Sequence, residues 1–426
     1  MQTQNPYAAP RARYYALGLL TVVYTFNFID RQLLAILQES IKAELLLSDA
    51  QLGLLTGFAF ALFYVTAGIP IARWADNSNR RNIVAWAIGI WSFMTAISGT
   101  VQNYSQLLMA RIGVGIGEAG GSPPAHSIIS DIFPPSSRAG ALSFYSTGVN
   151  IGVLFGFLAG GWLNEFFGWR VAFVVVGLPG IIIALLVRYT LREPIRGLAD
   201  QRVAKEKAEP LSEVLGLLWS RLSFRHMAMG AATNAFAVYS LNSWSASFFI
   251  RSYGLSSGEV GTWMALILGL GGALGLLAGG FLAQRLAAGD QRWYNWIPAW
   301  AAVISAPLAW CTVYVESMTL SLLLFIVPGC LATVYLGNTL AMVHGLVGLR
   351  MRALASAILF FVLNLIGLGL GPFSVGLVSD HLEPTLANES LRHALLYLVP
   401  IASVWSAFHF FSASRTLRED LAAAPS

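Results

Sequence analysis

The chain has 426 residues, of which 56% are hydrophobic and only 11% are charged. A soluble domain carries about 25% charged residues, so the composition excludes a soluble protein and indicates an integral membrane protein. The two cysteines, Cys311 and Cys330, lie in apolar stretches and are too few for a disulfide framework or a metal cluster. We therefore expect them to be packing residues.

Twelve apolar stretches follow one another along the chain, each long enough to predict a membrane-spanning helix. They lie at about 14–40, 49–73, 82–101, 104–131, 138–163, 170–190, 224–250, 257–284, 293–315, 318–345, 352–380 and 391–413. The first six occupy residues 14–190 and the second six occupy residues 224–413. The stretch between them, 191–223, is rich in charged residues and predicts a linker on the membrane surface, part of it an amphipathic helix.

The loops differ in their basic residues. The loops on one side of the predicted membrane hold most of the arginines, whereas the opposite loops hold only Lys42, Arg170, Arg251 and Arg392. Basic residues concentrate on the cytoplasmic side, so this pattern places both termini and the linker in the cytoplasm. It also accounts for the net charge of +5 as a signal of topology and excludes nucleic-acid binding.

The first apolar stretch contains Asp30 and Arg31 in its middle, within "YTFNFIDRQLLAIL". An ionised side chain at that depth costs at least about 2.5–3.5 kcal/mol, so such groups face a protein interior or a wet cavity and find partners there. The fourth stretch carries Arg111 and Glu118, which lie about 10 Å apart along one helix face. Because the two stretches run in opposite directions, all four charges fall at one depth and sum to zero.

These four residues are the candidate site for proton coupling and substrate. Glu118 near Arg31, and Asp30 beside Arg111, can each bind and release a proton, because burial favours the neutral acid and an adjacent cation favours the charged one. The two arginines can hold an anionic head group. A static ion-pair cluster that locks the two helices together is the alternative.

The second set of six stretches has no acid or base at mid-helix, and its polar positions are uncharged. Asn242 lies 212 residues after Asp30, close to the spacing of an internal repeat. These positions are candidates for lining a cavity, with hydrogen bonding between helices as the alternative: Asn234, Tyr239, Asn242, Ser243, Tyr335, Asn338 and Asn364. A charged wall in the first half and an apolar wall in the second suit an amphipathic substrate.

The repeat itself is visible in two places. The segment "ARWADNSNRR" after the second stretch has a counterpart 208 residues later, and Gly156 has a counterpart in Gly371, 215 residues later. We expect two pseudo-symmetric six-helix bundles. Four charged residues would cluster at the cytoplasmic end and form a gate, or mark topology alone: Asp76, Arg80, Arg81 and Arg138.

With these features the chain resembles the major facilitator superfamily. Asp76, Arg80 and Arg81 match the family's loop signature after the second helix, whereas Ala72 and Asn77 depart from it, as does Asn79. The resemblance implies the all-α fold of that family, with twelve transmembrane helices in two six-helix bundles and both termini cytoplasmic. In the second half, a glutamine replaces the signature aspartate.

Within the superfamily the chain resembles the spinster family. The matching segments are "NFIDRQLL", "RIGVGIGEAGGSPPAHSIISDIFPPSSRA", "GWRVAF" and "GDQRW". Spinster-like proteins are transporters associated with lysophospholipids and sphingoid lipids, and bacterial members are thought to couple to protons. The resemblance implies a multi-pass protein of the bacterial inner membrane, which we expect to be a monomer among membrane lipids.

We therefore expect a proton-coupled secondary transporter of an amphipathic, lipid-like substrate that works by alternating access. Three alternatives stay open: an organic-anion/proton symporter, a drug exporter of the same fold, and a membrane receptor without transport. The first is kept because "DR" in the first helix also resembles such carriers. We expect that the protein is not an enzyme and uses no cofactor other than the coupling proton, since the sequence has no metal-ligand cluster, nucleophile elbow or phosphate loop.

Overall fold

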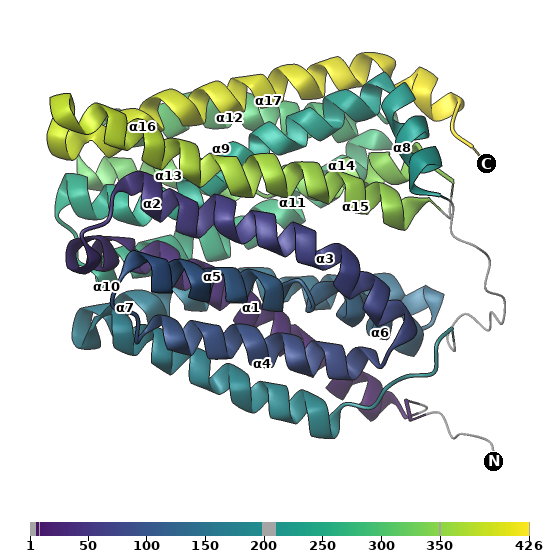
Figure 1. Ribbon diagram of the computed structural model, residues 1–426. Helices are drawn as coiled ribbons and strands as arrows, with labels where there is room; N and C mark the ends of the chain where they lie inside the picture. The colour runs from purple at the N-terminus through teal and green to yellow at the C-terminus, as the bar shows by residue number, and fades with distance from the viewer. Residues whose placement is uncertain (1–5, 8, 198–209, 349–350, 426) are drawn as a thin grey trace. The chain divides into compact units, whose positions relative to one another are not determined.

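The computed structural model describes residues 6–7, 9–197, 210–348 and 351–425, and every regular element among them is helical (Figure 1). The chain forms two compact units. The first comprises Met1–Leu47, Ala59–Lys205 and Ser256–Ala265, and the second comprises Ser48–Phe58, Glu206–Leu255 and Leu266–Ser426. Each unit therefore takes one short segment, Ser48–Phe58 or Ser256–Ala265, from the other half of the sequence.

The described residues of the first unit form seven helices. They are α1 (Pro10–Leu45), α3 (Ala59–Asn77), α4 (Arg80–Ser98), α5 (Tyr104–Glu118), α6 (Ser122–Ile132), α7 (Pro135–Thr190) and α10 (Ser257–Met264). The π-helical segment η3 (Ala265–Leu270) begins at the end of this unit and continues into the second.

The second unit contains the remaining helices. They are α2 (Asp49–Gly53), α8 (Leu211–Ser220), α9 (Leu222–Tyr253), α11 (Gly271–Ala287), α12 (Trp293–Tyr314), α13 (Met318–Leu331), α14 (Val334–Gly345), α15 (Arg352–Leu363), α16 (Gly371–Leu386) and α17 (Ser390–Ala422), with the π-helical η1 (Leu54–Phe58) and η4 (Asn364–Leu370) and the 3₁₀ turn η5 (Ala387–Glu389). The expected amphipathic helix of the linker is α8, whereas linker residues 198–209 lie outside the described part of the chain.

The helices fall on the predicted apolar stretches, and the protein is a multi-pass membrane protein. By length and composition alone, seven helical segments of the described chain can cross a membrane. Two of them, Pro135–Thr190 and Leu354–Ala422, are 56 and 69 residues long, far more than the roughly 20 residues that one span needs. Gly168, with φ of 82°, breaks α7 between the fifth and sixth predicted stretches.

In the first unit, α1 packs closely along α7. Glycines recur on α7 every four residues at this crossing and allow the two backbones to approach closely. A Cβ added to Gly152 would lie 2.5 Å from Phe28 Cβ, and one added to Gly156 would lie 2.8 Å from Gln32 Cβ. Because these positions tolerate no side chain, they fix the register of α1 and hence the height of Asp30 and Arg31.

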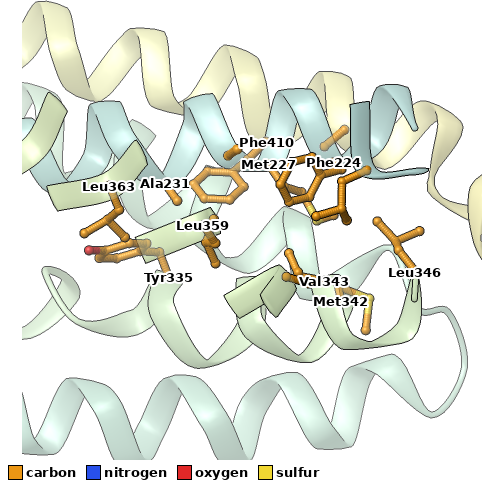
Figure 2. Close-up of a cluster of buried hydrophobic side chains, with 14 of the residues drawn as sticks. Phe224, Met227, Ala231, Tyr335, Met342, Val343, Leu346, Leu359, Leu363 and Phe410 are labelled. Atoms are coloured by element: carbon orange, nitrogen blue, oxygen red, sulfur yellow. The ribbon is translucent and has the colours of Figure 1, made fainter. Parts of the chain in front are cut away.

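The second unit has an apolar core where α9 and α17 pack against α14 and α15. Figure 2 shows Phe410 of α17, Met227 of α9 and Leu359 of α15 in one cluster, with Tyr335 at one end of it. Gly230 makes room for this packing, since an added Cβ would lie 3.1 Å from the Phe410 ring. The cluster continues under α8 through Val214 and Leu218.

Candidate functional site

Four charged side chains of α1 and α5 meet inside the first unit. Asp30 and Arg31 lie near the middle of α1, and Arg111 and Glu118 lie two turns apart on α5. Asp30, Arg111 and Glu118 are at most 2% exposed. The structure thus brings the four predicted residues together, in the pairs Asp30–Arg111 and Arg31–Glu118.

The Asp30–Arg111 pair is an extended two-pronged contact. Arg111 Nη1 donates to Asp30 Oδ1 at 3.4 Å, and Nη2 donates to Oδ2 at 3.5 Å. Thr95 of α4 lines the same small space as Asp30, and its hydroxyl donates to Trp91 O at 2.9 Å. Close charge-assisted bonds measure about 2.7–2.9 Å, so this pair is loosely closed. Burying the two charges costs the same desolvation free energy at any separation, whereas the attraction between them weakens at such distances. The attraction therefore offsets less of the desolvation cost than in a close pair.

The Arg31–Glu118 pair is tighter and has aromatic walls. Arg31 Nε donates to Glu118 Oε2 at 2.8 Å. The centre of the Arg31 guanidinium lies 5.0 Å from the Phe28 ring, 4.9 Å from the Phe60 ring and 5.1 Å from the Tyr64 ring. All three rings are within the roughly 6 Å at which a cation is attracted to an aromatic face.

The four charges sum to zero, but they do not satisfy one another completely. Within the described chain, Glu118 Oε1 and Arg111 Nε are buried without a hydrogen-bond partner. An unpaired buried polar atom costs about 1–3 kcal/mol, and more when it belongs to a charged group. The centre therefore has an open acceptor beside one arginine and an open donor on the other, where a proton or a polar ligand group would be stabilised.

Arg80, one of the predicted gate residues, is buried in a network within the first unit. Its guanidinium donates to Asp131 Oδ2 of α6 at 2.5 Å, to Ser127 Oγ at 2.7 Å and to Glu193 Oε1 at 2.8 Å. Pro194 O is a fourth acceptor, at 3.1 Å. Asp131 and Glu193 were not among the predicted site residues, because nothing in the sequence indicates that Arg80 is buried beside them.

Of the other predicted gate residues, Arg81 contacts this network through Glu193. The Arg81 backbone amide donates to Glu193 Oε2 at 2.9 Å, and Arg138 Nη2 donates to Phe133 O at 3.5 Å. Asp76 belongs to the last turn of α3, and its side chain lies outside what the structure describes. The loop of Arg80 and Arg81 is thus joined to the segment that follows α7.

The predicted cavity residues of the second half lie on α9, α14 and η4. Asn234, Ser243, Tyr335 and Asn338 are buried, whereas Tyr239, Asn242 and Asn364 are partly exposed. Asn338 Nδ2 donates to Val334 O within its own helix at 3.1 Å, and Tyr335 belongs to the apolar core (Figure 2). Asn242 Oδ1 is buried without a hydrogen-bond partner among the described residues.

An ionic anchor that the sequence reasoning missed holds α2 in the second unit. Arg251 of α9 forms two bonds of 2.7 Å to the Asp49 carboxylate, which also accepts a bond of 2.6 Å from Ser379 Oγ. Asp380 of α16 caps the same helix by accepting from the Asp49 and Ala50 amides at 2.8 Å each. The capping box of Ser48 with Gln51 was visible in the sequence and is present.

The first unit contains the same arrangement at α10. Glu165 of α7 accepts from the Gly258 amide at 2.7 Å, as Asp380 does from Ala50. Glu165 and Asp380 differ by the repeat spacing of 215 residues, and Gly258 and Ala50 differ by 208. The internal repeat would have located this second anchor, because an acid capping a helix N-terminus is stabilising in both halves.

The segment "GDQRW" forms a smaller ionic cluster outside the membrane-spanning segments. Asp290 accepts from Arg292 Nε at 2.9 Å and pairs with Arg418 of α17 at 3.0 Å. The hydrogen bond from Arg292 is the main cause that lowers the pKa of Asp290 to about 2. A lowered carboxyl pKa contributes stability that is present above the unfolded value and lost as pH falls towards 2.

No group of three or more metal-ligating side chains occurs in the part of the chain that the structure describes. The two cysteines are free thiols. His226 and His409 form an Nδ1···Nδ1 contact of 2.8 Å between α9 and α17, and His344 contacts Ser356 Oγ at 2.6 Å.

A helical membrane fold with buried acid–arginine pairs is typical of secondary transporters. The family model of the Major Facilitator Superfamily matches residues 20–372. This chain belongs to that superfamily, whose members are transporters and not enzymes.

Within the superfamily the chain is similar to spinster proteins. The crystal structure of a bacterial homologue of the human lysosomal transporter spinster, inward-facing and unoccupied, superimposes with a TM-score of 0.85 and 33% identity, over 97% of this chain and 99% of that one. An MFS-type efflux pump of Mycolicibacterium smegmatis is 35% identical over 97% of this chain and 95% of its own. The sphingosine-1-phosphate transporter SPNS2 of Danio rerio is 25% identical, over 95% of this chain and 84% of its own.

Proposed function

We propose that this protein is a proton-coupled transporter of an amphipathic, lipid-like substrate, of the lysophospholipid or sphingoid type, that works by alternating access. The buried pairs Asp30–Arg111 and Arg31–Glu118 carry the proposal. We place it in the bacterial inner membrane with twelve spans and cytoplasmic termini. Arg80 and its neighbours Asp76, Arg81 and Arg138 form the cytoplasmic gate.

The two carboxylates supply the coupling. Each is buried next to one arginine, which stabilises its charged form, whereas burial stabilises its neutral form. When the arginine is drawn to a ligand or moves with its helix, the carboxylate takes up a proton so that no uncompensated charge stays buried. The uptake and release of one proton are thereby tied to the position of Arg31 or Arg111.

The substrate class follows from the charges and the relatives. Among the described residues, Arg111 Nε has no hydrogen-bond partner, and the contact of Arg111 with Asp30 is loosely closed, so an anionic group can take a close charge-assisted bond there. The likeness to a sphingosine-1-phosphate transporter and to spinster proteins favours a lipid with a small charged head. The likeness to an efflux pump favours, as a second candidate, export of amphipathic drugs by the same site.

The proposal is tested by measuring the flux of single-chain lipids, amphipathic drugs and sugar acids into proteoliposomes with an imposed pH gradient. We expect gradient-driven flux of at least one lipid class that collapses when the gradient is dissipated. Flux of the lipids that does not respond to the gradient contradicts proton coupling. Gradient-driven flux of the sugar acids alone replaces the lipid with an organic anion, and absence of flux for the whole panel favours a receptor.

Substrate binding is expected to depend on tail length and on Arg111. Each buried methylene adds about 0.8 kcal/mol, or about fourfold in Kd, until the site is full. Arg111→Ala should weaken binding of an anionic lipid about 10- to 100-fold, since a hydrogen bond to a charged group contributes about 1.5–3 kcal/mol. Titration calorimetry over a series of tail lengths measures both effects.

A neutral analogue with the same tail is the matched control for the Arg111 variant. Its binding should change little, which also shows that the variant is folded. If affinity is flat across tail length while short hydrophilic anions compete well, the lipid substrate is wrong and the organic-anion alternative takes its place.

A further inference from the structure

The guanidinium of Arg31 sits in an aromatic cage. Phe28 comes from the helix turn before Arg31, and Phe60 and Tyr64 come from successive turns of α3. The Phe60 and Tyr64 rings are stacked with centroids 5.7 Å apart and an angle of 17° between their planes. Together with the Glu118 carboxylate, these three rings surround a positive charge with π-faces and one negative charge.

This combination is the chemistry that recognises organic cations. Aromatic faces attract a cation, more strongly where water is excluded than at exposed sites, and quaternary ammonium groups are bound in this way. A carboxylate in the same cage supplies the counter-charge. Glu118 here has a second oxygen, Oε1, that is buried and without a hydrogen-bond partner among the described residues.

The present occupant of the cage is a tethered side chain that is more exposed than the carboxylate with which it pairs. The Arg31 side chain is 15% exposed, whereas the Glu118 side chain is fully buried. Arg111, the other arginine of the centre, is only 2% exposed and enclosed by protein. Arg31 can therefore swing towards its exposed side, and a cation of similar size can follow into the space that it leaves.

We propose that the cage of Phe28, Phe60, Tyr64 and Glu118 is a subsite for the cationic group of an organic amphiphile, which binds there by displacing Arg31. The exchange replaces one cation by another, so Glu118 stays compensated and the buried charge stays balanced. The inference rests on the proposed function, because it assigns the cationic part of the substrate to the same charged centre. It leaves anionic groups to Arg111.

We expect that removing Arg31 from the cage raises the affinity for an organic cation and that removing one of the aromatic rings lowers it. Arg31→Ala vacates the cage while keeping Glu118, so the affinity for dodecyltrimethylammonium should rise about tenfold, as expected from losing a competing cation in a cage of three rings. Phe60→Leu, with Arg31 retained, should lower the same affinity several-fold. Combining Phe60→Leu with Arg31→Ala should cancel most of the gain.

The experiment is equilibrium binding of dodecyltrimethylammonium to the full-length protein, purified in an uncharged maltoside detergent. Phe144→Leu is the matched control, because it removes a ring of α7 that is 52% exposed and lies outside the cage. It should leave the affinity unchanged. Free methylguanidinium should compete with the probe in the Arg31→Ala variant, since it restores the missing group, and this competition also reports a correctly folded cage.

Two results overturn the inference: an affinity of the Arg31→Ala variant equal to or below that of the unmodified protein, or equal losses in Phe60→Leu and Phe144→Leu. Binding in detergent needs no gradient and no transport. Unchanged cation affinity together with gradient-driven lipid flux therefore overturns the cage alone. The predicted affinity changes without any gradient-driven flux leave the cage in place and overturn the transport proposal.

Discussion

Glu118→Gln is expected to abolish transport driven by a pH gradient while leaving a folded protein. Glutamine has nearly the same shape as glutamate and keeps an oxygen that can accept from Arg31 Nε, which donates to Glu118 Oε2 at 2.8 Å. The amide cannot take up or release a proton, so the neutral and charged states that couple the gradient to the helix no longer exist. The measurement is initial flux of lipid into proteoliposomes with and without the gradient.

Asp30→Asn is expected to have the same effect, because Asp30 is the other acid of the charged centre and lies beside Arg111. Glu213→Gln is the matched control, since it removes a carboxylate from the exposed face of α8 and should leave the gradient-driven flux unchanged. Downhill exchange without a gradient, together with monodisperse elution from a sizing column, shows that the variants are intact. Gradient-driven flux at the unmodified rate in both Glu118→Gln and Asp30→Asn contradicts the assignment.

The positions of the helices and of the four central charges could be predicted because exposed backbone polar groups and unpaired charges are both very unfavourable inside a membrane. Apolar stretches predict spans when no water is present to satisfy the backbone, and the helices of the described chain follow them. Asp30 and Arg31 on one helix, with Arg111 and Glu118 on another, could be paired because helical rise alone gives their depths. The structure has the same two pairs.

The contacts around that centre could not be predicted, because they depend on tertiary approach. Phe60 and Tyr64 fit an apolar stretch as well as any lipid-facing residue, and nothing in their spacing indicates that they surround Arg31. Arg80 carries a positive charge in a loop whether or not it is buried, so its partner Glu193 was invisible. For Tyr335, periodicity does not distinguish a cavity wall from the apolar core in which it lies.

The contacts at the beginning of α2 include one that could be predicted from the sequence and one that could not. The capping box of Ser48 predicted the beginning of a helix from four residues, because a cap is a local interaction. The partner of Asp49, Arg251, is 202 residues away and was placed only in an outer loop by its charge. Sequence reasoning therefore located the helix terminus and missed the ion pair made there.

Asp49→Asn is expected to lower the free energy of unfolding by about 3 kcal/mol. Breaking a buried ion pair from one side costs about 3–5 kcal/mol, and the lower value applies because the Arg251 side chain is 13% exposed. The variant replaces a carboxylate that takes two bonds of 2.7 Å from Arg251, so a neutral amide then faces that guanidinium. The change is measured by unfolding the protein in a mild detergent with increasing amounts of dodecyl sulfate and monitoring the loss of helix by far-UV circular dichroism.

Two further variants separate the ion pair from a general effect of charge removal. Glu389→Gln breaks a more exposed pair with Arg392, in which the glutamate side chain is 45% exposed, and should cost at most about 1 kcal/mol. The double variant Asp49→Asn with Arg251→Met removes both charges of the pair and should be more stable than Asp49→Asn alone, since no partly buried guanidinium then faces a neutral amide. Equal losses in Asp49→Asn and Glu389→Gln, or a double variant less stable than either single one, would show that the pair does not hold α2 in place and that the Asp380 cap alone is sufficient.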